Sequence, residues 1–280
     1  MRSGTTPAPT LQEIREAHSW KRDYERYLFL SRYLFRPLGF LVTWVAIRLG
    51  LTSEGVSWLS GLVGLAGCGL LVSGWQQVLP AGIGLLLLFN LLDCVDGSIA
   101  RTMKTENPYG RFLDSVCGGV IDLVFWAVVG ILAFQHPNLL HWPNPFEYGP
   151  IFWLAVGGMT CFMCQTLGLL EQSFDGLLKP SWNKGQGLQA KQVGSNDGVQ
   201  EELSVRPNNQ QSTWPLRLIV ATNLRVRETH YVLLVAAYLA SIVDVLLSVY
   251  LVYYLVYSLL LLVVYSKRGQ QIRRSYLVAK

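Results

Sequence analysis

Six apolar stretches, each close to the length of a membrane-spanning helix, constrain this chain more than any other feature. They cover roughly residues 56–73, 79–96, 110–134, 151–170, 230–243 and 245–265. About 20 predominantly apolar residues are needed for a helix to cross the hydrocarbon core of a bilayer. Hydrophobic residues make up 51% of the chain and charged residues only 15%. The sequence therefore predicts an all-α integral membrane protein with six transmembrane helices.

The N-terminal part has a different composition. Residues 11–36 mix Lys and Arg with many aromatic side chains, a pattern typical of an amphipathic helix lying in the membrane interface. The short apolar stretch 38–49 is interpreted as a continuation of that helix or as a shallow re-entrant segment. We therefore expect an interfacial, cytoplasmic segment over residues 1–50, followed by a six-helix domain over 51–280.

One long connection lies inside the predicted domain. Residues 183–213 are rich in Gly, Gln, Asn and Ser and show no hydrophobic periodicity. Such a composition buries too little apolar surface to offset the entropy of ordering. We expect a disordered loop there.

Two acidic residues stand at the end of the second apolar stretch. Asp93, Asp96, Gly97 and Ala100 are spaced i, i+3, i+4 and i+7, which places them on one face of a helix. A carboxylate in or at the rim of a bilayer is costly, so it indicates a functional site.

The next apolar stretch repeats this pairing, because Gly110 and Asp114 are spaced i, i+4. If the two helices are antiparallel neighbours, three carboxylates converge on a groove floored by small residues. Hard cations such as Mg²⁺ and Mn²⁺ prefer oxygen ligands, and Mg²⁺ is typically held by a few carboxylates together with substrate phosphates. The groove leaves room for a nucleotide, and Arg101 is placed to meet a phosphate.

At these residues the chain resembles the CDP-alcohol phosphotransferase family, whose pattern is D-x2-D-G-x2-A-R-x8-G-x3-D-x3-D. The match runs from Asp93 to Asp114 with every spacing correct. The resemblance extends over roughly residues 30–270, although only 93–114 is highly specific. It implies an enzyme of phospholipid or related phosphodiester synthesis. Such an enzyme transfers a phosphoalcohol or phosphatidyl group from a CDP-linked donor to the hydroxyl of a lipid or small polar acceptor, and releases CMP.

The resemblance also implies roles for individual residues and a homodimeric assembly. One or two Mg²⁺ or Mn²⁺ ions would be held on the donor diphosphate, and the nucleotide would lie among small residues close to the start of the first span. The implied metal ligands are Asp93, Asp96 and Asp114, and the implied nucleotide-binding residues are Ser57, Gly97, Ala100, Arg101 and Gly110.

The last position of the pattern departs from the family, because the fourth aspartate is replaced by Gly118. In the family this aspartate is thought to take the proton of the acceptor. The next acid is Asp122, one helical turn further on, and we consider it as a substitute base acting through water. The alternatives are an acceptor that is already ionised, such as a phosphate, or an enzyme with impaired or altered chemistry.

Basic residues predict the orientation and a further candidate contact. The predicted external loops, near 74–78, 135–150 and 243–245, contain none of the 23 Lys and Arg residues. By the positive-inside rule, both termini and the acidic groove face the cytoplasm. Attraction to anionic lipid suffices to explain the net charge of +5, and no nucleic-acid partner is expected. Arg225 and Arg227 could bind a phosphate of the acceptor or serve only as anchoring charges.

Two other classes of protein fit part of this pattern. A non-catalytic relative would bind metal and nucleotide without turnover and act as a partner subunit. An intramembrane prenyltransferase also uses Asp pairs with Mg²⁺ on a diphosphate, but its motifs are separate boxes of the D-x3-D or N-D-x2-D type. The G-x2-A-R that follows Asp96 argues against this second class.

Overall fold

The structure is a computed structural model that describes residues 9–19, 24–143, 148–180 and 216–278. Within these ranges the chain is helical and contains no β-strand, which confirms the predicted all-α class. The predicted disordered loop over 183–213 lies outside the described residues. The helices divide into two compact units, residues 1–161 with 214–249 and residues 162–213 with 250–280. The predicted boundary at residue 50 stays a prediction, and the candidate site lies in the first unit.

Five segments of the described chain are long and apolar enough to cross a membrane. Each of them begins within three residues of a predicted span. They contain the helices α3 (Ser53–Leu71), α4 (Leu79–Thr102), α5 (Pro108–Gln135), α6 (Ile151–Ser173) and α10 (Val243–Val278). The multi-pass membrane character is supported, but the number six is not confirmed.

The remaining predicted span corresponds to α9 (Arg227–Ala240), which has 14 residues. At about 1.5 Å per residue this helix is roughly 21 Å long, shorter than the ~30 Å core of a bilayer. It ends at Ser241, which adopts a positive φ of 55°. This turn separates α9 from α10 and explains why the nearly continuous apolar sequence 231–265 forms two helices.

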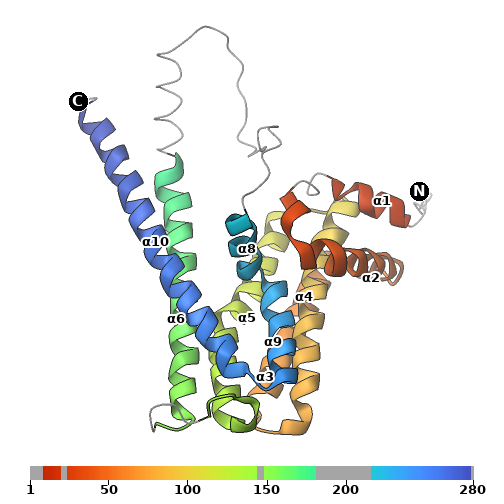
Figure 1. Cartoon of the computed structure of the whole chain (residues 1–280). Helices are drawn as coiled ribbons and strands as arrows, with labels where there is room; N and C mark the ends of the chain where they lie inside the picture. The colour runs from red at the N-terminus through yellow and green to blue at the C-terminus, as the bar shows by residue number, and fades with distance from the viewer. Residues whose placement is uncertain (1–8, 20–23, 144–147, 181–215, 279–280) are drawn as a thin grey trace, which may run out of the picture. The chain divides into compact units, whose positions relative to one another are not determined.

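Glycines bring the helices of the first unit close together. A Cβ placed on Gly67 of α3 would lie 3.0 Å from the carbonyl oxygen of Gly82 in α4. A Cβ on Gly61 would lie 3.0 Å from Sγ of Cys117 in α5. Small residues at helix contacts are typical of membrane proteins, where they allow backbones to approach. Figure 1 shows α3, α4 and α5 as neighbouring helices, with α9 beside α4.

The N-terminal residues form several short helices where the sequence predicted one continuous amphipathic helix. They are α1 (Leu11–Glu16), two short turns at Tyr24–Tyr27 and Ser31–Phe35, and α2 (Arg36–Arg48). Thr10 caps α1, and its hydrogen bonds to the Glu13 carboxylate lower the pKa of Glu13. An ion pair between Glu25 and Arg36 folds the segment back onto the start of α2.

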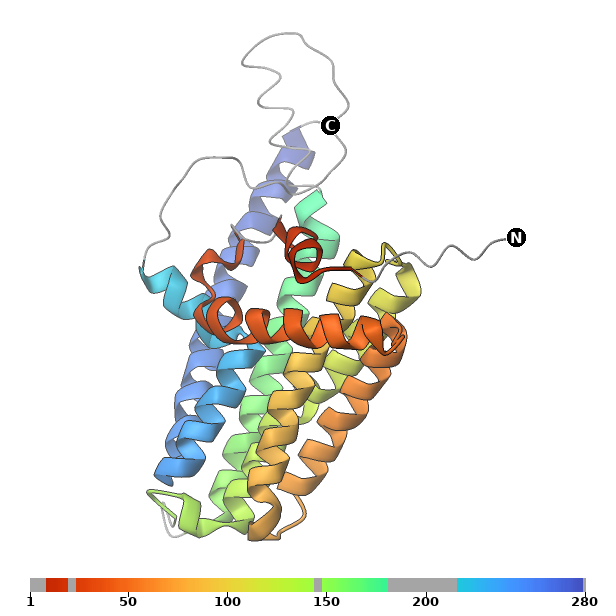
Figure 2. The same cartoon turned by 90° about the vertical axis from the view of Figure 1, so that its right-hand side faces the viewer.

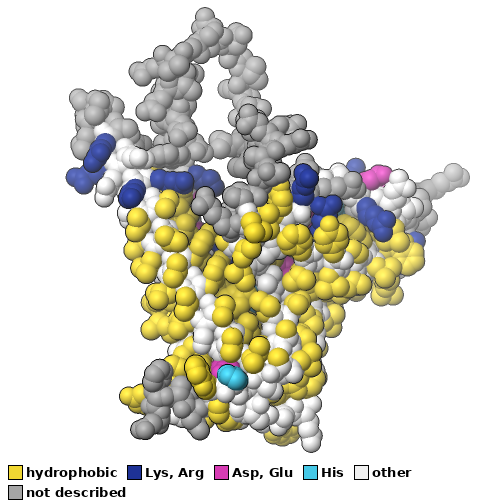
Figure 3. Space-filling model, in the orientation of Figure 1, with side chains coloured by type: hydrophobic (Ala, Val, Ile, Leu, Met, Phe, Trp, Pro, Cys, Tyr) yellow, Lys and Arg dark blue, Asp and Glu magenta, His cyan; other side chains and the backbone are white. Residues whose placement is uncertain are grey.

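Helix α2 has one face against the helices and one face turned outward. Gly39, Thr43 and Ala46 are buried, whereas Leu38 and Leu41 are exposed. Figure 2 shows α2 running across the upright helices of this unit, and Ala46 packs in a core cluster with Val95 of α4. In Figure 3 the Lys and Arg side chains around α1 and α2 lie above a predominantly hydrophobic surface. This arrangement fits a helix at a membrane interface.

In the second unit, described by itself, Phe174 stacks on Tyr265 with ring centroids 4.1 Å apart. Arg268 lies over the Phe174 ring, 5.6 Å from its centroid. These contacts join the two helical stretches of that unit.

Candidate active site

A pocket of about 90 Å³ lies where α3, α4 and α5 meet the loop after α4. It contains seven of the predicted site residues, namely Ser57, Asp96, Gly97, Ala100, Arg101, Gly110 and Asp114. Its other lining residues are Ser53, Thr105, Glu106, Asn107 and Arg111. The expected pairing of the two acidic helix faces is therefore present for Asp96 and Asp114.

Asp96 is held in this pocket by several hydrogen bonds. It is 2% exposed, and its Oδ2 accepts a hydrogen bond of 2.5 Å from the hydroxyl of Ser57. Its Oδ1 accepts from the backbone N–H of Gly97. Ser53, which sequence reasoning did not assign to the site, donates a 2.9 Å hydrogen bond to the backbone carbonyl of Asp96. The first turn of α3 thus fixes both the backbone and the carboxylate of this residue.

The helix starts at the pocket are set by side-chain caps. Thr52 caps α3 by accepting a hydrogen bond of 3.1 Å from the N–H of Gly55. Asn107 caps α5 by accepting one of 2.7 Å from the N–H of Gly110, and its amide donates to Glu54 at 2.8 Å. A cap satisfies a backbone donor that the helix leaves unpaired. Through Asn107 and Glu54 the starts of α5 and α3 are tied together beside the pocket.

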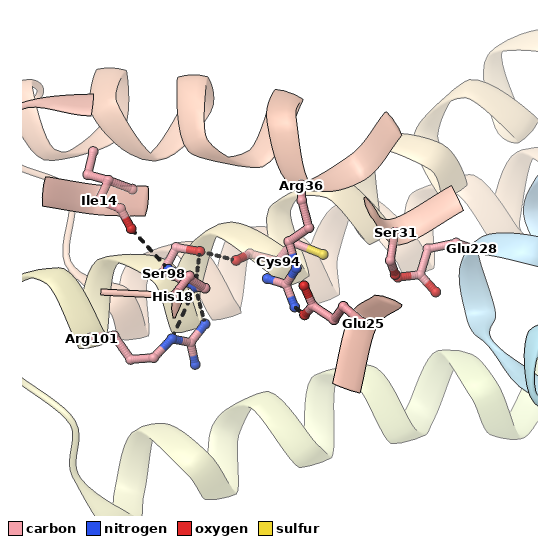
Figure 4. A network of polar contacts seen from close by, with 9 residues as sticks. All are labelled: Ile14, His18, Glu25, Ser31, Arg36, Cys94, Ser98, Arg101 and Glu228. Carbon is pink, nitrogen blue, oxygen red and sulfur yellow. Dashed lines mark hydrogen bonds and ion pairs between the residues drawn. The ribbon is translucent and has the colours of Figure 1, made fainter. Parts of the chain in front are cut away.

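Arg101 is positioned by a residue that sequence reasoning missed. Its Nε and Nη2 lie 3.1 and 2.7 Å from Nε2 of His18 (Figure 4). Because a guanidinium can only donate, Nε2 must accept, and the ring proton sits on Nδ1, which faces the carbonyl of Ile14 at 3.2 Å. His18 is therefore a neutral acceptor that holds Arg101 over Gly97, whose added Cβ would lie 3.1 Å from the guanidinium. No sequence pattern pairs His18 with Arg101, because 83 positions separate them.

Asp93 points to a different partner from Asp96. Its Oδ2 lies 2.9 Å from Nη1 of Arg227, at the start of α9. The same guanidinium binds Asp122 through two hydrogen bonds, Nε to Oδ1 at 2.9 Å and Nη2 to Oδ2 at 2.8 Å. Arg227 therefore joins the first predicted metal ligand to the predicted substitute base, and neither of these acids lines the pocket.

Gly118, the departure from the family pattern, lies directly against this arginine. A Cβ at Gly118 would lie 2.7 Å from Nη2 of Arg227. The second predicted acceptor-binding residue, Arg225, is the last residue of α8 (Leu216–Arg225), two positions before Arg227. Neither arginine is among the residues that line the pocket.

The N-terminal segment is fastened to the same part of the molecule. Ser31 donates a hydrogen bond of 2.6 Å to the carboxylate of Glu228, the residue after Arg227 (Figure 4). Ser98 of α4 lies 3.1 Å from Nε2 of His18. The segment before α2 thus contacts both the motif helix α4 and the start of α9.

The carboxylate oxygens of the pocket are the candidate ligands for a divalent cation. Among the described residues no three His, Cys, Asp or Glu side chains are grouped so that they could hold a metal ion by themselves. Asp96 and Asp114 share the pocket, and Mg²⁺ is commonly bound by one or two carboxylates together with substrate phosphates. The pocket therefore fits a cation that arrives with a phosphorylated ligand.

Residues 53–169 match the model of the CDP-alcohol phosphatidyltransferase family. The matched range spans α3 to α6 and includes the whole pocket, and it confirms the resemblance seen in the motif. No curated protein matches the chain.

Proposed function

We propose that this chain, whose residues 53–169 resemble the CDP-alcohol phosphatidyltransferases, transfers a phosphoalcohol or phosphatidyl group from a CDP-linked donor to a hydroxyl acceptor. The observation that carries this proposal is the pocket in which Asp96 and Asp114 face Gly97, Gly110 and Arg101. In the reaction the acceptor oxygen forms a bond to the donor phosphorus next to the alcohol. The bond from that phosphorus to the CMP oxygen breaks, and the hydroxyl proton leaves for a base or for water.

Asp96 and Asp114 would hold an Mg²⁺ or Mn²⁺ ion together with the donor diphosphate. When bound, the ion supplies neutralisation of the charge that develops on the leaving CMP. Ser57 orients the Asp96 carboxylate by its hydrogen bond, as outer partners of metal ligands commonly do. Asp93 is the third predicted ligand, but its carboxylate forms an ion pair with Arg227.

The other pocket residues bind and orient the donor. Gly97, Ala100 and Gly110 add almost no side-chain volume, which leaves room for the cytidine. Arg101, held by His18, steadies a phosphate. Arg227, which binds two carboxylates, is less suited to bind the acceptor phosphate that the sequence predicted for it, whereas Arg225 remains a candidate for that role.

The proton acceptor is the point at which this chain differs from its family. Gly118 has no side chain, and both oxygens of Asp122 accept hydrogen bonds from Arg227. These hydrogen bonds hold the Asp122 carboxylate on Arg227 and away from the pocket, so it is poorly placed to take a proton from the acceptor. We therefore propose altered or slow transfer to neutral alcohols, with faster transfer to an acceptor that is already ionised.

A second candidate is a non-catalytic relative that binds nucleotide and metal and serves as a partner subunit. This alternative is favoured by the position of Arg227, whose guanidinium lies against Gly118, where the family has its fourth aspartate. A prenyltransferase is not favoured, because the family match covers the pocket. In either form we propose a homodimer with both termini and the pocket facing the cytoplasm, as the resemblance and the charge distribution imply.

The experiment is a screen of CDP-linked donors against lipid, polar and phosphorylated acceptors in Mn²⁺ or Mg²⁺, with CMP release as the readout. Asp96→Asn is the control, because it removes a proposed ligand and keeps the side-chain size. The proposal predicts CMP release that is lost in EDTA and in the variant. Binding of CDP with no CMP release from any pair would support the non-catalytic alternative.

A further inference from the structure

We propose that the guanidinium of Arg227 is an internal cation that stands in the place of a second divalent ion, between Asp93 and Asp122. The chain would then bind one metal ion fewer than it can bind without this arginine. The inference deepens the proposed function, since it concerns the same acidic site.

The contacts of Arg227 are those of a cation shared by two carboxylates. All three of its guanidinium nitrogens are used, one toward Asp93 at 2.9 Å and two toward Asp122 at 2.9 and 2.8 Å. The side chains of Arg227 and Asp93 are 21% and 23% exposed, and that of Asp122 is 44% exposed. Two carboxylates on helices in a membrane need a compensating positive charge. The chain supplies that charge itself.

Gly118 provides the space that this arrangement needs. An added Cβ there would lie 2.7 Å from Nη2 of Arg227, closer than a carbon and a nitrogen can approach without a shift. The neighbouring Gly119 has nothing within 4 Å of the same position. The guanidinium therefore lies where a side chain at position 118 would begin, and the fourth family aspartate and this conformation of Arg227 exclude each other.

The start of α9 and its neighbours position the guanidinium of Arg227. Arg227 is the first residue of α9, after Val226 in an extended conformation. The following Glu228 is 8% exposed and accepts the hydrogen bond from Ser31. A helix N-terminus carries partial positive charge and is an unfavourable place for an arginine. The two carboxylates compensate for this position, and the guanidinium also lies over the Phe89 ring, 5.0 Å from its centroid.

Removing the guanidinium of Arg227 therefore takes away the cation that Asp93 and Asp122 share. Mn²⁺ is used to test whether a metal ion can take its place. The experiment counts Mn²⁺ bound per chain in the detergent-solubilised full-length protein with saturating CDP. Three chains are compared, the unmodified one, Arg227→Met and Arg227→Lys. Met has a similar length and no charge, whereas Lys keeps the charge.

The proposal predicts that Arg227→Met binds one Mn²⁺ more than the unmodified chain, and that Arg227→Lys binds the same number as the unmodified chain. An equal count in the unmodified chain and Arg227→Met would overturn it. A failure of the proposed function is distinguishable, because it appears as absent CMP release, whereas this inference depends only on the difference between two counts.

Should Arg227→Met fail to fold, two milder variants decide the question in the unmodified background. Asp96→Asn is expected to weaken Mn²⁺ binding at least about tenfold, as changes at metal sites commonly do. Asp93→Asn is expected to leave the Mn²⁺ affinity nearly unchanged, because the Asp93 carboxylate is paired with Arg227 and does not bind the metal ion. A loss with Asp93→Asn as large as with Asp96→Asn would show that Asp93 is a metal ligand and would contradict the proposal.

Discussion

The hydroxyl of Ser57 donates a hydrogen bond of 2.5 Å to the Asp96 carboxylate across the contact between α3 and α4. This hydrogen bond uses part of the capacity of Oδ2 to accept hydrogen bonds. It also fixes the orientation of the carboxylate that lines the pocket. A serine one turn into a helix thus orients a carboxylate 39 positions away in the sequence.

Ser57→Ala tests this orientation. We expect Mn²⁺-dependent CDP affinity to fall about tenfold, because loss of a partner behind a metal ligand commonly costs 10- to 100-fold. The matched control is Ser60→Ala on the same helix. Ser60 is equally buried, and its hydroxyl donates to the carbonyl of Ser57 rather than to Asp96. Equal affinities of the two variants, measured by equilibrium binding, would show that Asp96 needs no orientation.

His18→Ala tests the support of Arg101. The variant removes the acceptor for two donors of Arg101 and leaves the guanidinium free to move from its place over Gly97. We expect weaker binding of CDP-linked donors and a smaller change in the binding of cytidine, which carries no phosphate. His18→Gln, whose amide oxygen can accept from Arg101, should recover part of the loss. An equal loss for both ligands would indicate a general structural effect.

Gly118→Ala and Gly119→Ala form a matched pair for the contact with Arg227. Both replacements add the same methyl group to α5 and gain similar helix propensity, about 1 kcal/mol. Only the methyl at 118 meets the guanidinium, at 2.7 Å. We expect a lower Tm for Gly118→Ala than for Gly119→Ala, measured in the same detergent. The reverse order would mean that Arg227 moves aside without cost.

The predicted orientation can be tested with cysteines at exposed positions on the described part of the chain. Glu16→Cys in α1 should react with an impermeant thiol reagent from the cytoplasmic side. Asn138→Cys, in the connection between α5 and α6, should react from the other side. None of the five native cysteines, all of which lie in the described residues, forms a disulfide, so labelling of the unmodified chain is the background. Labelling of both positions from the same side would contradict the orientation.

Sequence reasoning located most of the pocket because its residues recur at helical spacing on two neighbouring helices. The pocket lining includes five of these residues, Asp96, Gly97, Ala100, Gly110 and Asp114. The one assumption needed was that the two helices lie next to each other. The fifth apolar stretch was predicted as one of six spans, but α9 has only 14 residues. The apolar sequence alone does not place its end, because it continues through Ser241, where the backbone turns at φ 55°.

The contacts that sequence reasoning did not find are those made by single residues far apart in the chain. Arg227 reaches Asp122 across 105 positions, and His18 reaches Arg101 across 83. Neither pair lies on a common helix, so no periodicity relates its members. Gly118 was recognised as a departure from the family, but only the structure shows that Arg227 lies against it.

We propose that the pocket at Asp96 and Asp114 binds a CDP-linked ligand together with a divalent cation. Equilibrium binding of CDP to the solubilised chain, measured with Mn²⁺ or with EDTA and compared with the Asp114→Asn variant, tests this directly. We expect saturable binding in Mn²⁺ that disappears in EDTA and in the variant. Equal binding of CDP with Mn²⁺ and with EDTA would contradict it.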